Sequence, residues 1–166
     1  MSDAGNKMRH VIEYEQPRMF PVASATDVLR GDMTSFDRSV PGIAPAGDFT
    51  WDTDLATTQR GFAKVFAGVA AAKADVGETD EVRVDTDSVF VMACASATWE
   101  VGDLVAPAKA AGNALLAQTV IATNRRDGAI GRVAYREASA VTEVRVKLTS
   151  PLQDLRCCWT TTTTTT

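Results

Sequence analysis

The chain has 166 residues, 45% hydrophobic and 23% charged, which is typical of one globular domain or two very small ones and excludes a disordered chain. The formal net charge of −4 argues against a nucleic-acid partner, because such proteins usually carry a basic patch. No apolar run is long enough to span a bilayer and no secretory signal opens the sequence, so we expect a soluble chain made in the cytoplasm, with no membrane partner.

Composition divides the chain into three parts. Residues 1–16 are mostly polar, and we expect an N-terminal arm that is mobile or held by a partner. Residues 17–156 are expected to form a single β-rich domain. Residues 157–166 end in a run of threonines without apolar periodicity, which predicts a C-terminal tail outside the fold.

The domain opens with short extended segments. A strand is expected at 18–22, and the stretch 27–36 is typical of a strand, a turn and a second strand. Gly31 and Asp32 supply that turn, because glycine tolerates positive φ and aspartate closes an Asx-turn. Prolines and glycines then make 38–48 a loop.

One short amphipathic helix is expected at about 54–65. Leu55, Phe62 and Phe66 recur at helical spacing, and the Asp-Thr-Asp run before them supplies a cap. Gly61 weakens the helix by roughly 1 kcal/mol relative to alanine. Gly68 is expected to mark its exit into a strand.

The rest of the chain is expected to be β. Charged residues and valine alternate at 81–85, so Val82 and Val84 share a face, and the apolar run 89–93 fits a strand buried on both sides. Further elements are a strand at 69–72, a turn and strand at 101–105, a loop at 107–113, and strands at 117–123, 129–136 and 141–149. In the last strand, Val144, Val146 and Leu148 are expected to face the core. Short strands at this spacing predict a mainly β fold, a compact β-barrel or β-sandwich.

The chain also contains a degenerate internal repeat, with related halves at about 27–85 and 99–149. Three motifs recur in the same order: Gly-Asp, then Gly-(x)-Val-Ala, then Glu-Val-Arg-Val. The offset between copies is 102 − 31 = 71 at the glycine of Gly-Asp, 133 − 69 = 64 at the valine, and 143 − 81 = 62 at the glutamate. Loops that shorten between strands would give this pattern, so we interpret it as a duplicated β-unit.

Cysteine and histidine offer little chemistry. The lone histidine, His10, lies in the polar arm, which is a poor place for a residue that must be held against a nucleophile. Cys94 lies in an apolar run and is expected to be a buried small hydrophobe. Cys157 and Cys158 are adjacent near the C-terminus and lack the spacing of a zinc site. A disulfide between two chains is kept as an alternative for this pair.

Two Asp-Thr-Asp runs are the best candidates for a metal site. Asp52, Asp54, Asp85 and Asp87 would have to converge to bind Mg²⁺ or Ca²⁺ in a metal-dependent hydrolase. Neither run continues into a calcium-binding loop, and neither has the glycine of an aspartic protease motif. A helix cap at the first run and a hairpin turn at the second are the favoured interpretation.

Nucleotide binding is not indicated either. No glycine pattern forms a phosphate cradle, and the tryptophans are not interleaved with basic residues as in a base-stacking surface. Trp99 is expected in the core or at an interface. Trp51 follows the loop and could anchor a partner, although core packing is favoured.

Several stretches resemble a family of tailed-bacteriophage capsid decoration (cement) proteins. These are GDMTSFD at 31–37, FAKVFAGVAAAKA at 62–74, WEVGDLVAPA at 99–108 and AIGRVAYREASAVTEVRVKL at 129–148. The likeness covers roughly residues 27–150 and rests mainly on the order of the motifs. The long loop, the tail and the arm depart from the family pattern.

The resemblance implies a non-enzymatic structural protein of the virion that decorates and stabilises the capsid shell. Its partners would be the major capsid protein and further copies of itself, often as a homotrimer, at the capsid surface after synthesis in the host cytoplasm. We therefore predict no catalytic, cofactor-binding or metal-binding residue. The alternatives are another lattice or filament subunit, the metal-dependent hydrolase, and a small-ligand β-barrel.

Overall fold

The computed structural model describes residues 10–12, 18–22, 25–36, 42–78 and 80–152. The tail expected at 157–166 lies outside these residues, as does most of the arm expected at 1–16. Within that arm, a short strand forms. The described elements are β1 His10–Ile12, β2 Arg18–Pro21, β3 Met33–Phe36, β4 Ile43–Pro45, η1 Ala46–Asp48, α1 Leu55–Lys64, β5 Phe66–Ala70, β6 Glu81–Asp85, β7 Val89–Trp99, β8 Leu104–Lys109, β9 Leu115–Thr123, η2 Arg126–Gly128, β10 Gly131–Val133 and β11 Glu137–Leu148.

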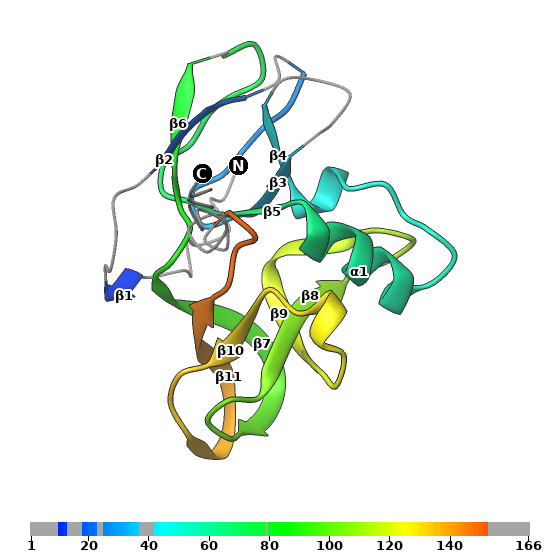
Figure 1. Ribbon diagram of the computed structural model, residues 1–166, viewed down its shortest axis with the longest axis vertical. Coiled ribbons are helices and arrows are strands. Elements are labelled where there is room, and N and C mark those ends of the chain that lie inside the picture. The colour runs from blue at the N-terminus through cyan, green and yellow to red at the C-terminus, as the bar shows by residue number, and fades with distance from the viewer. Residues whose placement is uncertain (1–9, 13–17, 23–24, 37–41, 79, 153–166) are drawn as a thin grey trace, which may run out of the picture.

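The strands form two units with the same strand order (Figure 1). The first unit has the order β2-β6-β5-β3-β4, and the second has β7-β11-β10-β8-β9, with β1 added beside β7. In the second unit β7 also pairs in parallel with β9, for example Cys94 with Val120, which closes a five-stranded barrel. In the first unit a single parallel bridge, Val22 with Ile43, joins the end of β2 to β4 at the matching place. The mainly β fold and the barrel predicted from the sequence are confirmed.

The strand register identifies equivalent residues and extends the repeat. Three cross-strand pairs of the first unit have counterparts in the second. Met33–Val69 corresponds to Leu104–Arg132, and Ala70–Val84 corresponds to Val133–Val146. Phe20–Val82 corresponds to Met92–Val144. The repeat therefore includes β2 and β7, which the sequence motifs did not contain. The predicted match of Val69 with Val133 is wrong by one residue, because Val69 occupies the place of Arg132, an offset of 132 − 69 = 63.

The Gly-Asp turns of the two units have the same geometry. Gly31 has φ 93° and Gly102 has φ 92°, the left-handed conformation that favours glycine. Asp32 and Asp103 each accept a hydrogen bond at 2.9 Å from the backbone N–H three residues earlier. The predicted role of Gly-Asp as turn chemistry is confirmed in both copies.

Strand β5 is shared by two hydrophobic cores. All of its residues are buried, and its four side chains other than glycine are divided between the two clusters. Phe66 and Val69 belong to the cluster that fills the second unit, whereas Ala67 and Ala70 belong to the cluster inside the first unit. The first unit therefore packs against the second through a strand that has no solvent-facing side.

Helix α1 lies between η1 and β5, beside the second unit (Figure 1). It begins after Asp54, whose carboxylate accepts the N–H of Thr57 at 2.7 Å, and it ends at Lys64. Phe62 is fully buried and meets the ring of Phe49 edge-on, with the ring centroids 5.4 Å apart. The helix predicted at 54–65 is thus confirmed to within a residue at each end.

Side-chain hydrogen bonds join the two units. Each runs from a polar side chain of one unit to the other: Gln59 Nε2 to the Pro107 carbonyl at 2.8 Å, Gln118 Nε2 to Asp32 Oδ1 at 2.9 Å, and Ser150 Oγ to the Phe66 and Ala67 carbonyls at 3.0 Å. The first and the last are buried, so they satisfy backbone groups that water cannot reach.

Several predicted boundaries are wrong. Strand β8 continues to Lys109, although a loop was predicted from Pro107 onward. Strand β10 pairs with β8 only at Leu104 and Val105, so Pro107 has just one neighbouring strand there, and its missing N–H is tolerated. Other differences are that β5 starts at Phe66 and contains Gly68, that β7 runs on to Trp99, that β10 spans only Gly131–Val133, and that the strand expected before the first Gly-Asp turn is a single bridge, Val28 with Ala74.

We predict that Gly68→Ala and Gly131→Ala each destabilise the protein by roughly 1–3 kcal/mol or more. A Cβ at either position would overlap the backbone carbonyl of the neighbouring strand and lie 2.8 Å from Cγ1 of Val84 or Val146. Urea unfolding would measure the loss. Gly47→Ala is the control, because the nearest atom to its Cβ is 3.7 Å away. Equal stability of all three variants would contradict the prediction.

Candidate functional site

The first Asp-Thr-Asp run forms the start of helix α1. Asp54 is the N-cap, and hydrogen bonds from Thr57 lower the pKa of its carboxyl below 3.8. Asp52 accepts hydrogen bonds from the backbone N–H and the hydroxyl of Thr53, at 2.7 and 2.9 Å. Both carboxylates are thus engaged in local hydrogen bonds, as expected for a helix cap.

The second Asp-Thr-Asp run links the two units. Asp85 is the last residue of β6, is buried, and pairs with Arg83 at 3.2 Å. Asp87 accepts from Lys147 of β11. The predicted turn is present, but it joins two different sheets and is not a hairpin.

The described residues contain no group of three or more His, Cys, Asp or Glu side chains placed to hold a metal ion. The four aspartates of the hydrolase hypothesis are accordingly not brought together into one site. Cys157 and Cys158 lie outside the described residues, and of His10 only the backbone is described, in β1.

Trp99 lies in the core of the second unit, and the half-buried Trp51 packs against that core. Trp99 is buried, with 3% of its surface exposed, and belongs to the core of the second unit. Trp51 packs against the same core, and the ammonium group of Lys109 lies 4.9 Å from the centroid of its ring. This contact joins the α1 side of the first unit to β8.

The long ribbon formed by β7 and β11 is bent by two opposed bulges. From Glu137 to Val141, β11 advances 141 − 137 = 4 residues while β7 advances 99 − 97 = 2. From Val141 to Glu143, β11 advances 143 − 141 = 2 while β7 advances 97 − 93 = 4, so the register is restored. Bulges bend a strand and re-aim its side chains. Here they direct Val141 against the core.

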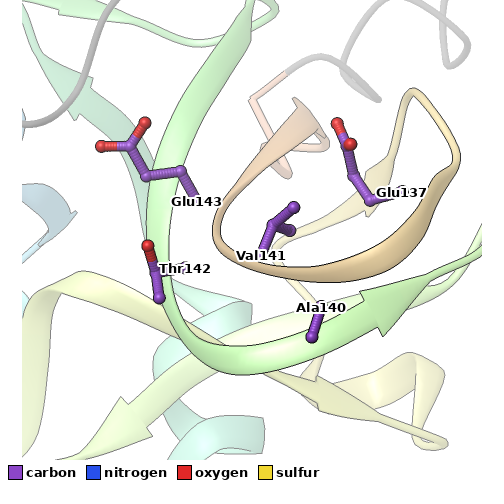
Figure 2. A pocket seen from close by; sticks show the side chains of 5 residues that line it. All are labelled: Glu137, Ala140, Val141, Thr142 and Glu143. Atoms are coloured by element: carbon purple, nitrogen blue, oxygen red, sulfur yellow. The ribbon is translucent and has the colours of Figure 1, made fainter.

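An open hollow of about 400 Å³ lies at these bulges, on the outer end of the ribbon (Figure 2). It is lined by residues of β11 alone: Glu137, Ala140, Val141, Thr142 and Glu143. The two carboxylates do not point toward each other (Figure 2). Glu137 lies 3.8 Å from Arg145, so part of its charge is balanced within the strand.

The thiol of Cys94 lies close to the strand that lines this hollow, and it is poorly reactive. Cys94 is 8% exposed, and its Sγ lies 3.6 Å from the Val141 carbonyl. Burial raises the pKa of the Cys94 thiol, and the charge of Glu143 raises it further. The protonated thiol is a poor nucleophile. The buried small hydrophobe expected at this position is therefore what the structure contains.

The most unusual carboxylate is Asp32, at the contact between the units. Its side chain is 4% exposed and accepts from Gln118 as well as from the Leu29 N–H. Burial raises its pKa above 3.8, and the charges of Asp27 and Asp48 add to the rise. The carboxylate thus serves as a structural link between the units.

Sequence reasoning identified Asp32 as a turn residue but missed its second role. The contact depends on Gln118, which lies in a different unit and belongs to no motif. Only the three-dimensional register could have revealed it. By contrast, the exposed Val101 was visible in the sequence as an apolar residue in a turn, where a polar one would be expected.

Comparisons with protein-family models, curated proteins and solved structures found no match for this chain. Within the part of the chain that the structure describes, no helix has the length and apolarity needed to cross a membrane.

We predict that Asp32→Asn changes how stability depends on pH. Because the pKa of folded Asp32 is raised, its favourable contribution is complete below pH 3.8 and is lost as pH rises through that raised value. The wild type should therefore gain stability relative to Asp32→Asn on acidification from neutral pH. Urea unfolding at several pH values would measure the difference. Asp103→Asn is the matched control, because it makes the same change in the equivalent turn of the second unit, at an exposed position.

We also predict that Cys94 reacts slowly with thiol reagents in the native protein. In a Cys157→Ser/Cys158→Ser variant, Cys94 is the remaining thiol, and it is buried with a raised pKa. Labelling should be complete only after unfolding in urea. A native labelling rate equal to the unfolded rate would show that the site is open.

Proposed function

We propose that this protein is a non-enzymatic structural component of a virion, which decorates and stabilises the capsid shell as a homo-oligomer. The observation that carries the proposal is the duplicated β-unit. The stretches that resemble capsid decoration proteins contain both Gly-Asp turns, the Ile-Gly-Arg-Val sequence at 130–133 and the final Val-Arg-Val-Lys-Leu sequence at 144–148, and these turns and strands have equivalents in both units. The resemblance therefore involves residues that determine this architecture.

The chemistry of the described residues agrees with a role in packing. The candidate aspartates form a cap and ion pairs, and the described thiol is buried and protonated. A unit whose described polar side chains serve packing is suited to binding many equivalent places on a lattice, where repeated weak contacts supply avidity. The partner would be the major capsid protein, and the homo-oligomer would be a trimer.

A second candidate is a subunit of another surface lattice or filament. The exposed apolar residues at the ends of the second unit favour it, since Val101 and Tyr135 are 65% and 43% exposed. In this case the same contacts between copies would build an open assembly rather than cover a shell.

Cryo-electron microscopy of purified particles tests the proposal. We expect density for both β-units on the outer surface of the shell, and loss of that density in particles made without the gene. Those particles should also break at lower temperature, because bound copies stabilise the assembled shell by mass action. Absence of the protein from purified shells would refute the capsid role.

A further inference from the structure

The two strands of the β7–β11 ribbon use equal lengths of chain to pass their bulges. The bulges lie between two cross-strand pairs, Glu143 with Ala93 and Glu137 with Trp99. Each strand advances six residues from one pair to the other, 143 − 137 = 6 and 99 − 93 = 6. A bulge normally accommodates an extra residue in one strand, but here the two bulges cancel and no residue is extra. A straight ladder can therefore join the same two pairs, and the bulges need another explanation.

The positions of the apolar side chains supply that explanation. We define the ribbon tip as residues 94–99 of β7 and 137–142 of β11. Before the tip, the residues of β7 and β11 in the core of the second unit have even numbers, such as Met92 and Val144. Within the tip, Ala97, Trp99 and Val141 have odd numbers and pack in or against the same core. Alternate residues of a regular strand face one side, so a straight ladder cannot place both sets inward. The bulges turn the tip over, and this buries Trp99.

The bulged arrangement carries two costs that offset the burial of Trp99. The bulges disrupt the hydrogen-bond ladder between the strands. In addition, the indole Nε1 of Trp99 is buried and has no hydrogen-bond partner of normal geometry among the described residues. It interacts with the Cys94 thiol, and this interaction lowers the pKa of the thiol, although burial raises that pKa more. Sulfur is a weak acceptor, so the buried indole N–H stays poorly satisfied, which destabilises the bulged arrangement.

The other side chains of the ribbon tip do little to fix its register. Most of them are small, are exposed in the bulged arrangement and lack a strongly apolar face: Ala95, Ser96, Thr98, Ala138, Ser139, Ala140 and Thr142. Strands of this kind specify their register weakly. Strand β9 pairs with β7 at Ala93 and Cys94, and beyond them the described partner of β7 is β11 alone. The tip can therefore rearrange without breaking the pairs that close the barrel.

We propose that the ribbon tip switches between the bulged arrangement and a straight ladder that exposes Trp99. Continuing the register of the end pairs through the tip places Val141 opposite Ala95, whereas the bulged arrangement places it opposite Ala97. In the straight ladder Trp99, Ala97 and Val141 face solvent, and Cys94 stays inward. The hollow around Val141 forms at the bulges (Figure 2), so the switch replaces this hollow with an apolar surface. The inference goes beyond the proposed function and does not depend on it.

Disulfide trapping tests the switch in the full-length chain with its three native cysteines replaced by alanine. In Ala95→Cys/Val141→Cys the thiols point to opposite sides of the bulged ribbon, because Ala95 is exposed and Val141 packs against the core. Such thiols cannot be bridged, but they are directly opposite in the straight ladder. The reference is Ala97→Cys/Val141→Cys, the observed pair. We expect the first pair to cross-link about ten to a thousand times more slowly than the reference, as for a minor state populated at about 0.1–10%.

A third pair, Ala95→Cys/Arg145→Cys, controls for unfolding. Arg145 pairs with Val91 in both arrangements, four residues from Ala95, so these two thiols meet only in an unfolded chain. Absence of a cross-link between Cys residues at 95 and 141, or a cross-link that forms no faster than in this control, overturns the inference.

A second variant shifts the balance between the two arrangements. Thr98 and Thr142 are exposed in the bulged tip and point inward in the straight ladder. Thr98→Val/Thr142→Val makes the inward face of the straight ladder apolar, so it should speed trapping of Ala95→Cys/Val141→Cys several-fold. Thr149→Val is the matched control, because it changes an exposed threonine outside the tip and should leave the rate unchanged. Equal rates with and without the two tip valines would also overturn the inference, and neither result bears on whether the protein is found on shells.

Discussion

Each unit depends on one place where two strands come closer than a side chain would allow. Gly68 meets the carbonyl of Asp85, and Gly131 meets the carbonyl of Lys147, so a Cβ on either glycine would overlap the backbone. The close approach occurs in a five-residue strand, β5, and in a three-residue strand, β10, and each of these strands also contacts the Gly-Asp turn of its own unit. There the N–H of Ala70 or of Val133, two residues after the glycine, bonds to the carbonyl of the aspartate, at 2.9 and 2.8 Å.

The units differ where they are joined, and this asymmetry determines which surfaces remain available. The first unit contains the additional helix α1, and it directs its turn, through Asp32, onto β9. The second unit has the longer strands, whose outer ends extend past the barrel and carry the bulges around Val141. Thus the sides of the two units that face each other are buried. The second Gly-Asp turn and the outer end of the β7–β11 ribbon stay accessible to other molecules.

Local features of this fold could be predicted from the sequence, and long-range ones could not. The inward set Val144, Val146 and Leu148 follows from a period of two, and the helix follows from its cap and apolar spacing. The sequence does not show that β2 and β7 belong to the repeat, because equivalent residues such as Phe20 and Met92 share only their apolar character. The contacts of the candidate site were the hardest to predict from the sequence, because they join residues of different units that no motif connects.

The position of β5 has a consequence for how the two copies of the unit depend on each other. A strand with both faces in hydrophobic cores cannot be removed with one copy without uncovering the other, so Phe66 and Val69 would meet water if the halves were separated. The two similar parts therefore share one strand between their cores. A substitution in β5 affects both halves at once, whereas one on the outer ribbon affects only its own.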